Sequence, residues 1–124
     1  MEKENQLKFL LVEDEPIAQI IAQTIIEKAK YSLDLACSAY NALNLIKNNQ
    51  YNIILLDLGL PDMSGIDLAK ELIEKLRIGI PIIAITAFNA NQKKHECIHN
   101  GFKGFIEKPL TEHKLYAITD KFIN

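Results

Sequence analysis

The chain has 124 residues, of which 48% are apolar and 24% are charged, with a net charge of −2 and a pI near 5.9. These values are typical of one globular domain, exclude a disordered or fibrous chain, and provide no basic field for nucleic acid. No apolar run reaches the roughly 18 residues of a membrane span and no secretion signal opens the chain, so we expect a soluble, cytoplasmic domain without nucleic-acid or membrane contacts.

The N-terminal part of the chain predicts two strands with a helix between them. Residues 1–7 are polar and are expected to be a frayed lead-in, whereas the apolar run 9–12 predicts a buried strand. Pro16 fits the first position of a helix that runs to about Lys30, with isoleucines at helical spacing. Residues 31–35 alternate between apolar and polar side chains, which predicts a strand at a sheet edge.

A second helix and a fully apolar strand follow. Ser38 is a suitable N-cap for a helix that ends at residues 48–50. Ile53–Leu56 is a continuous apolar run, typical of a strand buried on both faces of a parallel sheet. It leads directly into Asp57, which is therefore expected at the carboxyl end of the strand, where open α/β sheets place their chemistry. Taken alone, this aspartate could equally cap the following loop.

The rest of the chain continues the alternation of strands and helices. Ser64 and Asp67 approximate a capping box at the start of a helix that Gly79 closes. The remaining predicted elements are a strand over 80–85, a weakly apolar helix over 89–100, a strand over 103–106 and a helix that starts after Thr111 and runs to Phe122. Five alternating strand–helix pairs imply a mostly parallel sheet between two helical layers, an α/β three-layer sandwich.

Polar side chains follow four of the predicted strands. Glu13 and Asp14 follow the first strand, Asp57 the third, Thr86 the fourth and Lys108 the fifth. Because parallel strands end at the same edge of a sheet, we expect these side chains to converge. Three carboxylates there would repel one another by about 4 kcal/mol per pair at roughly 4 Å. A divalent cation with oxygen ligands, Mg²⁺ in particular, would offset this repulsion.

These residue types fit phosphoryl transfer. Asp57 is the best candidate nucleophile, because carboxylates can form aspartyl phosphates. The Lys108 ammonium could balance an incoming phosphoryl group, and the Thr86 hydroxyl could bond one of its oxygens. Taken singly, Lys108 could be an ordinary surface lysine and Thr86 an ordinary strand residue. Their occurrence together at strand ends favours a common site.

The sequence closely resembles the receiver domain of two-component response regulators over nearly its whole length. The resemblance rests on Glu13-Asp14, Asp57, Leu60-Pro61-Asp62-Met63-Ser64-Gly65, Thr86-Ala87 and Lys108-Pro109. It implies that residues 1–124 are one receiver domain with a flavodoxin-like (βα)5 fold and a parallel sheet of order 2-1-3-4-5. It also implies that Asp57 takes a phosphoryl group from a phosphohistidine, on a histidine kinase or a histidine phosphotransfer domain.

The resemblance implies a role for each site residue. Mg²⁺ would be bound by Asp14, Asp57 and the backbone carbonyl of Gly59, with Glu13 assisting through water. Lys108 would pair with the phosphoryl group. The domain would catalyse its own phosphorylation and dephosphorylation without being a conventional enzyme.

The resemblance also implies a switch. Thr86 would be drawn toward the phosphoryl group and Phe105 would fill the space it leaves, which biases the surface of the fourth helix, fifth strand and fifth helix. Many family members have tyrosine at the position of Phe105, so a hydroxyl-mediated readout is excluded here. The Lys108–Pro109 peptide bond is expected to be cis. Gly59 and the bulky Phe88 predict slow loss of the phosphoryl group.

Other protein classes also place an aspartate at the end of a strand or share this fold. A phosphatase of the haloacid-dehalogenase type needs an aspartate two residues after its nucleophile, where this chain has Gly59. A flavin-binding electron carrier needs a Ser/Thr/Gly-rich loop after the first strand, where this chain has Glu13-Asp14-Glu15. A docking module without phosphorylation would not need the full set of site residues.

The amino-acid sequences of the loop at 60–65 and of Ala84-Ile85-Thr86-Ala87 resemble those of receiver domains attached to hybrid sensor histidine kinases, which feed phosphorelays. The alternative that we expect is a stand-alone single-domain response regulator, without an output domain after Asn124. In either context the domain is expected to be a monomer or weak dimer.

Overall fold

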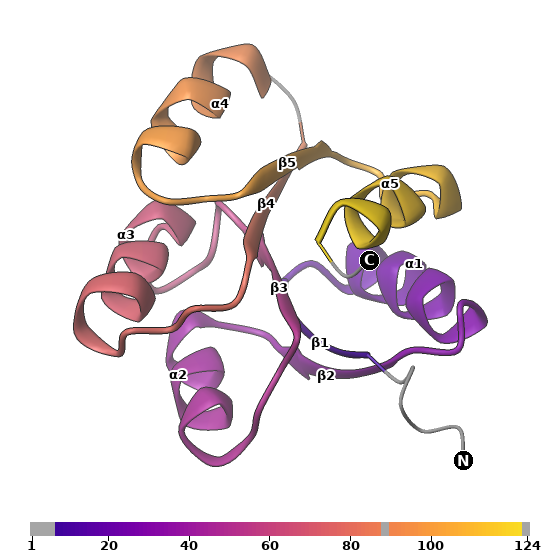
Figure 1. Cartoon of the computed structure of the whole chain (residues 1–124), viewed down its shortest axis with the longest axis horizontal. Helices are drawn as coiled ribbons and strands as arrows, with labels where there is room; N and C mark the ends of the chain where they lie inside the picture. The colour runs from indigo at the N-terminus through magenta and orange to yellow at the C-terminus, as the bar shows by residue number, and fades with distance from the viewer. Residues whose placement is uncertain (1–6, 88–89, 123–124) are drawn as a thin grey trace.

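The computed structural model describes residues 7–87 and 90–122, so the predicted lead-in over 1–6 and the prediction for Phe88 lie outside the described residues. Within this part of the chain, five parallel strands form a sheet of order β2-β1-β3-β4-β5 with helices on both faces (Figure 1). The predicted α/β fold, strand order and edge position of the second strand are confirmed. None of the described helices is long and apolar enough to cross a membrane.

The strands are β1 (Lys8–Val12), β2 (Ser32–Ala36), β3 (Ile53–Asp57), β4 (Ile82–Thr86) and β5 (Gly104–Glu107). The helices are α1 (Pro16–Lys28), α2 (Ala39–Asn48), α3 (Gly65–Lys70), α4 (Ala90–His99) and α5 (Glu112–Phe122). A π-helical turn, η2 (Glu71–Lys75), continues α3. The predicted caps Ser38, Ser64 and Thr111 each accept a hydrogen bond from the backbone N–H three residues later, at 3.1 Å.

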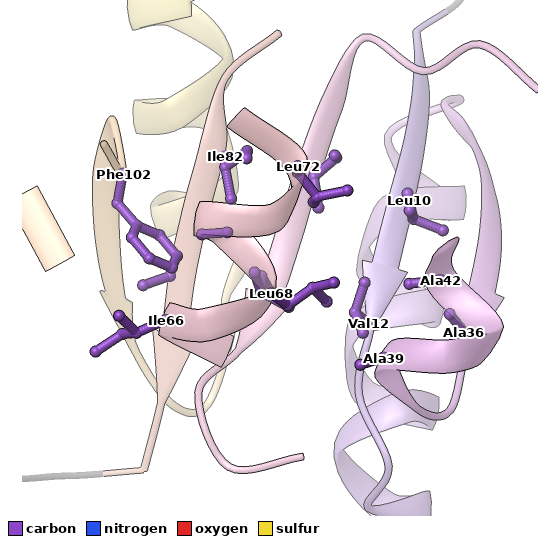
Figure 2. Close-up of a cluster of buried hydrophobic side chains, with 14 of the residues drawn as sticks. Leu10, Val12, Ala36, Ala39, Ala42, Ile66, Leu68, Leu72, Ile82 and Phe102 are labelled. Atoms are coloured by element: carbon purple, nitrogen blue, oxygen red, sulfur yellow. The ribbon is translucent and has the colours of Figure 1, made fainter. Parts of the chain in front are cut away.

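The hydrophobic core lies in two layers because strand side chains alternate between the two faces of the sheet. Leu10 and Val12 of β1 point to the layer covered by α2, α3 and α4 (Figure 2). Phe9 and Leu11 point to the opposite layer, covered by α1 and α5 (Figure 1). β3 is buried along its whole length, as its apolar run predicts. Charged groups are therefore excluded from the middle of this strand and gather at its end.

Two predictions about element ends are wrong. Leu7 does not fray: its side chain is buried and its carbonyl accepts a hydrogen bond from the backbone N–H of Ser32 at 3.0 Å. Gly79 does not close the third helix. The wide turn η2 ends that helix earlier, and Arg77 adopts the left-handed backbone conformation with a φ of 56°. The left-handed backbone conformation therefore occurs at Arg77, two residues before Gly79.

Several of the isoleucines that predict α1 lie outside its buried face, although Ile25 packs against the core. Ile17 and Ile20 are 65% and 64% exposed, whereas Ala22 and Ile26 are buried. The helix is apolar around most of its circumference, so spacing alone establishes the helix and not the face that it buries. The outer isoleucines remain as an exposed apolar stripe.

Gly65 allows the start of α3 to pack against the end of β3. A Cβ atom at Gly65 would lie 2.5 Å from the carbonyl oxygen of Asp57 and 2.7 Å from the Cα of Leu58. We expect Gly65→Ala to lower the free energy of unfolding by about 2 kcal/mol or more, because both obstacles are backbone atoms. Urea denaturation measures this. Gly59→Ala is the matched control, since no atom lies within 4 Å of its Cβ position; equal losses in both variants would contradict the prediction.

Candidate functional site

The carboxyl edge of the sheet gathers the polar residues that follow the strands. Glu13 and Asp14 follow β1, Asp57 is the last residue of β3, Thr86 is the last residue of β4, and Lys108 follows β5. Oxygen atoms of the three carboxylates lie within 4.8 Å of one another. The structure therefore brings together the carboxylates that the sequence places at two neighbouring strand ends.

Lys108 lies between two buried carboxylates. Its Nζ is 2.8 Å from Oε1 of Glu13 and 3.4 Å from Oδ2 of Asp57. Glu13 is only 1% exposed and Asp57 only 7%. Because buried charges are costly unless they are paired, the ammonium stabilises the ionised form of both side chains.

The positive charge of Lys108 does not fully balance the negative charges of the clustered carboxylates. The pKa of Glu13 is raised to about 7: burial is the main cause, hydrogen bonds from Lys108 and from the Glu15 N–H oppose it, and the charge of Asp57 adds to the rise. Burial acts to lower the pKa of Lys108, but the Glu13 and Asp57 carboxylates outweigh it and hold that pKa above its usual range. Near neutral pH the site thus holds a permanently charged ammonium and a glutamate that is protonated part of the time.

The two residues predicted to form a switch lie on the last two strands. Thr86 is half-buried, and its carbonyl accepts a hydrogen bond from the backbone N–H of Lys108 at 2.7 Å. Phe105 is half-buried on β5, next to Ala84 of β4, and packs against the core layer of α2, α3 and α4. The Lys108–Pro109 peptide bond is cis, as predicted.

The loop after β3 also folds back on the site. The backbone N–H of Gly59 donates to Oδ1 of Asp57 at 3.2 Å, and Gly59 forms an isolated bridge with Ser64. The carboxylates of Glu13, Asp14 and Asp57 make a set of oxygen donors. Hard oxygen ligands of this kind suit Mg²⁺ and lack the nitrogen and sulfur that zinc prefers.

Two further residues hold the site, and the sequence predicts this role for neither, although Asp62 belongs to the loop motif at 60–65 on which the resemblance rests. Gln19 of α1 donates its side-chain amide to the carbonyl of Glu13 at 2.7 Å. Asp62, in the loop after β3, accepts from the backbone N–H groups of Ala39 and Tyr40, each at 3.0 Å, and these bonds lower its pKa. The Asp62 bonds join segments more than twenty residues apart, which no local pattern predicts.

Comparison with known protein sequences gives the family that the resemblance implies. The family model described as the response regulator receiver domain matches residues 9–120. The aerobic respiration control sensor protein ArcB of Escherichia coli (strain K12) is 37% identical over 118 residues, which are 94% of this chain and 15% of that protein. The osmosensing histidine protein kinase SLN1 of Saccharomyces cerevisiae is 30% identical over 125 residues, which are 96% of this chain and 10% of that protein. The chain thus spans less than a sixth of these sensor proteins.

Solved structures of receiver domains are similar to this chain in fold. The receiver domain of a sensor histidine kinase from Pseudomonas aeruginosa PAO1, solved with a magnesium ion coordinated in its active site cleft, has a TM-score of 0.84 and 30% identity. The match covers 95% of this chain and 98% of that one. A CheY-like receiver domain protein from Methanospirillum hungatei JF-1 has a TM-score of 0.85 and 28% identity, over 96% of this chain and 95% of that one.

Removal of the ammonium group should expose the repulsion between the carboxylates. The folded-state pKa of Glu13 lies above its ordinary value of 4.5, so the folded protein binds more protons than the unfolded chain, and stability falls as pH rises from about 5 to 7.5. We expect Lys108→Met to steepen this fall and to cost about 1–3 kcal/mol more at about pH 8 than at about pH 5.

Urea denaturation in EDTA at the two pH values measures this difference, with Lys103→Met as an exposed control. An equal loss of stability at both pH values would show that Lys108 does not balance the carboxylates.

Proposed function

Because the chain belongs to the response regulator receiver domain family, we propose that Asp57 accepts a phosphoryl group from a phosphohistidine. One observation carries the proposal: the Asp57 carboxylate ends β3 with the Lys108 ammonium 3.4 Å away and two further carboxylates beside it. A lone strand-end aspartate would not need this surrounding set of charges.

The chemistry follows from the groups present. An oxygen of Asp57 forms a bond to phosphorus as the phosphorus–nitrogen bond of the phosphohistidine breaks, and the imidazole leaves with the electron pair of that bond. The Lys108 ammonium balances charge on the phosphoryl oxygens, and the Thr86 hydroxyl donates to one of them. Attack of water later returns inorganic phosphate and the free carboxylate.

The oxygen donors of the site are proposed to hold Mg²⁺. Asp14, Asp57 and the Gly59 carbonyl would bind the ion, and Glu13 would assist through water. When bound, Mg²⁺ supplies positive charge that offsets the carboxylates and the phosphoryl oxygens. The geometry supports a cation site, because the carboxylates of Glu13, Asp14 and Asp57 have oxygen atoms within 4.8 Å of one another.

The output is proposed to run through Thr86 and Phe105 to the face formed by α4, β5 and α5. Support comes from α4, in which Cys97 is buried whereas the neighbouring Ile98 is 56% exposed. A helix with little buried apolar surface needs little energy to shift. Slow loss of the phosphoryl group stays a prediction: Gly59 has no side chain to orient a water, and Phe88 lies outside the described residues.

The exposed apolar stripe of α1 is proposed to dock the phosphohistidine donor. Ile17, Ile20 and Ile21 are 65%, 64% and 37% exposed. A pocket of about 120 Å³ continues from Ile17 and Ile21 to Lys108 and Pro109, so the stripe reaches the edge of the phosphorylation site. Exposed apolar surface beside a reactive group suits the apolar face of a helix that presents the phosphohistidine.

We propose that the domain is part of a longer signalling protein. The matched proteins are sensor kinases of which this chain spans a small part, which supports a receiver domain of a hybrid sensor histidine kinase in the cytoplasm. A stand-alone single-domain response regulator, monomeric or weakly dimeric, is the alternative. The complete set of site residues disfavours a docking module that is never phosphorylated.

Direct phosphorylation tests the proposal. Incubation with acetyl phosphate and Mg²⁺ is expected to add one phosphoryl group to the intact protein, as measured by mass spectrometry. The addition should require Mg²⁺ and vanish in Asp57→Asn, which keeps the shape of the side chain and removes its charge. If neither acetyl phosphate nor a phosphohistidine donor adds a phosphoryl group, the docking-module reading replaces this one.

The docking role of the exposed apolar stripe of α1 is tested by comparing a protein donor of the phosphoryl group with a small-molecule donor. We expect Ile20→Glu to slow transfer from a phosphorylated histidine phosphotransfer domain by about tenfold or more, because a buried charge in the contact costs at least about 1.4 kcal/mol. Phosphorylation by acetyl phosphate should be unchanged, since this small donor needs no docking. Ile98→Glu, on the exposed face of α4, is the matched control. An equal loss of transfer rate in this variant would contradict the proposal that α1 docks the phosphohistidine donor.

A further inference from the structure

We propose that Lys114 of α5 is a positioning residue that fixes the backbone from which Lys108 reaches Asp57. This inference deepens the proposed function and rests on it. The Lys114 Nζ donates to the carbonyl of Glu107 at 2.7 Å and to the carbonyl of Pro109 at 3.2 Å. These carbonyls belong to the residues immediately before and after Lys108, so one ammonium group holds both sides of the lysine that faces the phosphorylation site.

The position of Lys114 within α5 is unusual for a cation. It is the third residue of the helix, and its backbone N–H is capped by Thr111 at 3.1 Å. The N-terminus of a helix carries partial positive charge and disfavours a lysine. The side chain instead turns back beyond the end of the helix to the two carbonyls. Charge-assisted hydrogen bonds of this kind offset the unfavourable position.

The backbone at Lys108 is thereby held from two directions. On the sheet side its N–H donates to the carbonyl of Thr86, the last residue of β4, at 2.7 Å. On the helix side Lys114 holds the flanking carbonyls, and α5 itself is anchored by the buried Leu115. The long stem of Lys108 therefore starts from a fixed point.

Such positioning matters for rate. The Lys108 Nζ meets Glu13 at 2.8 Å and Asp57 at 3.4 Å only if its backbone stays in place. A displacement of about 1 Å in a catalytic group can lower a rate by up to about a hundredfold. Loss of the two hydrogen bonds from Lys114 should act on the rate of phosphorylation through Lys108, and leave the oxygen donors for Mg²⁺ unchanged.

Lys114→Met keeps the length of the stem and removes its donors. We expect this variant to lower the rate constant of phosphorylation by acetyl phosphate by about tenfold, with the Kd for Mg²⁺ changed by less than about twofold. Lys114→Arg, which keeps a donor, should recover most of the rate. Lys121→Met, an exposed lysine on the same helix, is the matched control and should behave like the wild type.

A double-mutant cycle separates positioning from general destabilisation. In a Lys108→Met background, the added Lys114→Met should change the remaining rate by less than about twofold, because its effect requires Lys108. An equal fractional loss in both backgrounds, or no loss in either, would overturn the proposal.

Crystal structures of the wild type and Lys114→Met give a readout that needs no phosphorylation. The Lys108 ammonium should leave Asp57 in the variant, and an unmoved Lys108 overturns the positioning role. If the wild type is never phosphorylated, the proposed function fails, while this comparison still decides whether Lys114 holds Lys108.

Discussion

The structure depends on how one ammonium group, that of Lys108, balances carboxylates that the fold forces together. β1 and β3 are neighbours in a parallel sheet and each ends in acidic residues, so Glu13 and Asp57 meet at one edge. The cation comes from β5, with β4 lying between it and β3. Because strands are spaced about 4.8 Å apart, the charge must cross roughly 10 Å. A long side chain is therefore required, and the end of its backbone must be fixed for the charge to arrive at the carboxylates.

That requirement explains why side chains outside the site tie its loops to the helices. Gln19 of α1 bonds the carbonyl of Glu13, and Asp62 joins the loop after β3 to the start of α2. Lys114 of α5 bonds the carbonyls beside Lys108. Three of the segments beside site residues are thus each held by a polar side chain, and none of these three side chains need meet a bound group. The chemistry lies at strand ends and in the loops that follow them, and contacts with the helices help to fix its geometry.

The sequence predicts the elements of this arrangement better than the contacts between them. The fully apolar run before Asp57 predicts a buried strand and a charged end, because a strand buried on both faces has no other place for a carboxylate. The capping serines and Thr111 predict helix starts because their partners lie three residues away. The hydrogen bonds of Asp62 cannot be predicted from a local sequence pattern, because their partners lie more than twenty residues away. The same holds for Arg77, whose left-handed backbone follows from the wide turn η2 and not from its own side chain.

The outer stripe of α1 is the most informative difference between pattern and structure. If packing alone had shaped α1, all of its isoleucines would face the core, yet only part of them do: Ile26 is buried, while Ile17 and Ile20 face solvent. Their exposure costs solubility and gives the isolated domain no compensating contact. Local rules are broken chiefly where function requires it, and this stripe borders the pocket that leads to Lys108. A helix that is apolar on two sides can therefore serve two surfaces: the inner side packs on the sheet, and the outer side is the surface proposed to dock the phosphohistidine donor.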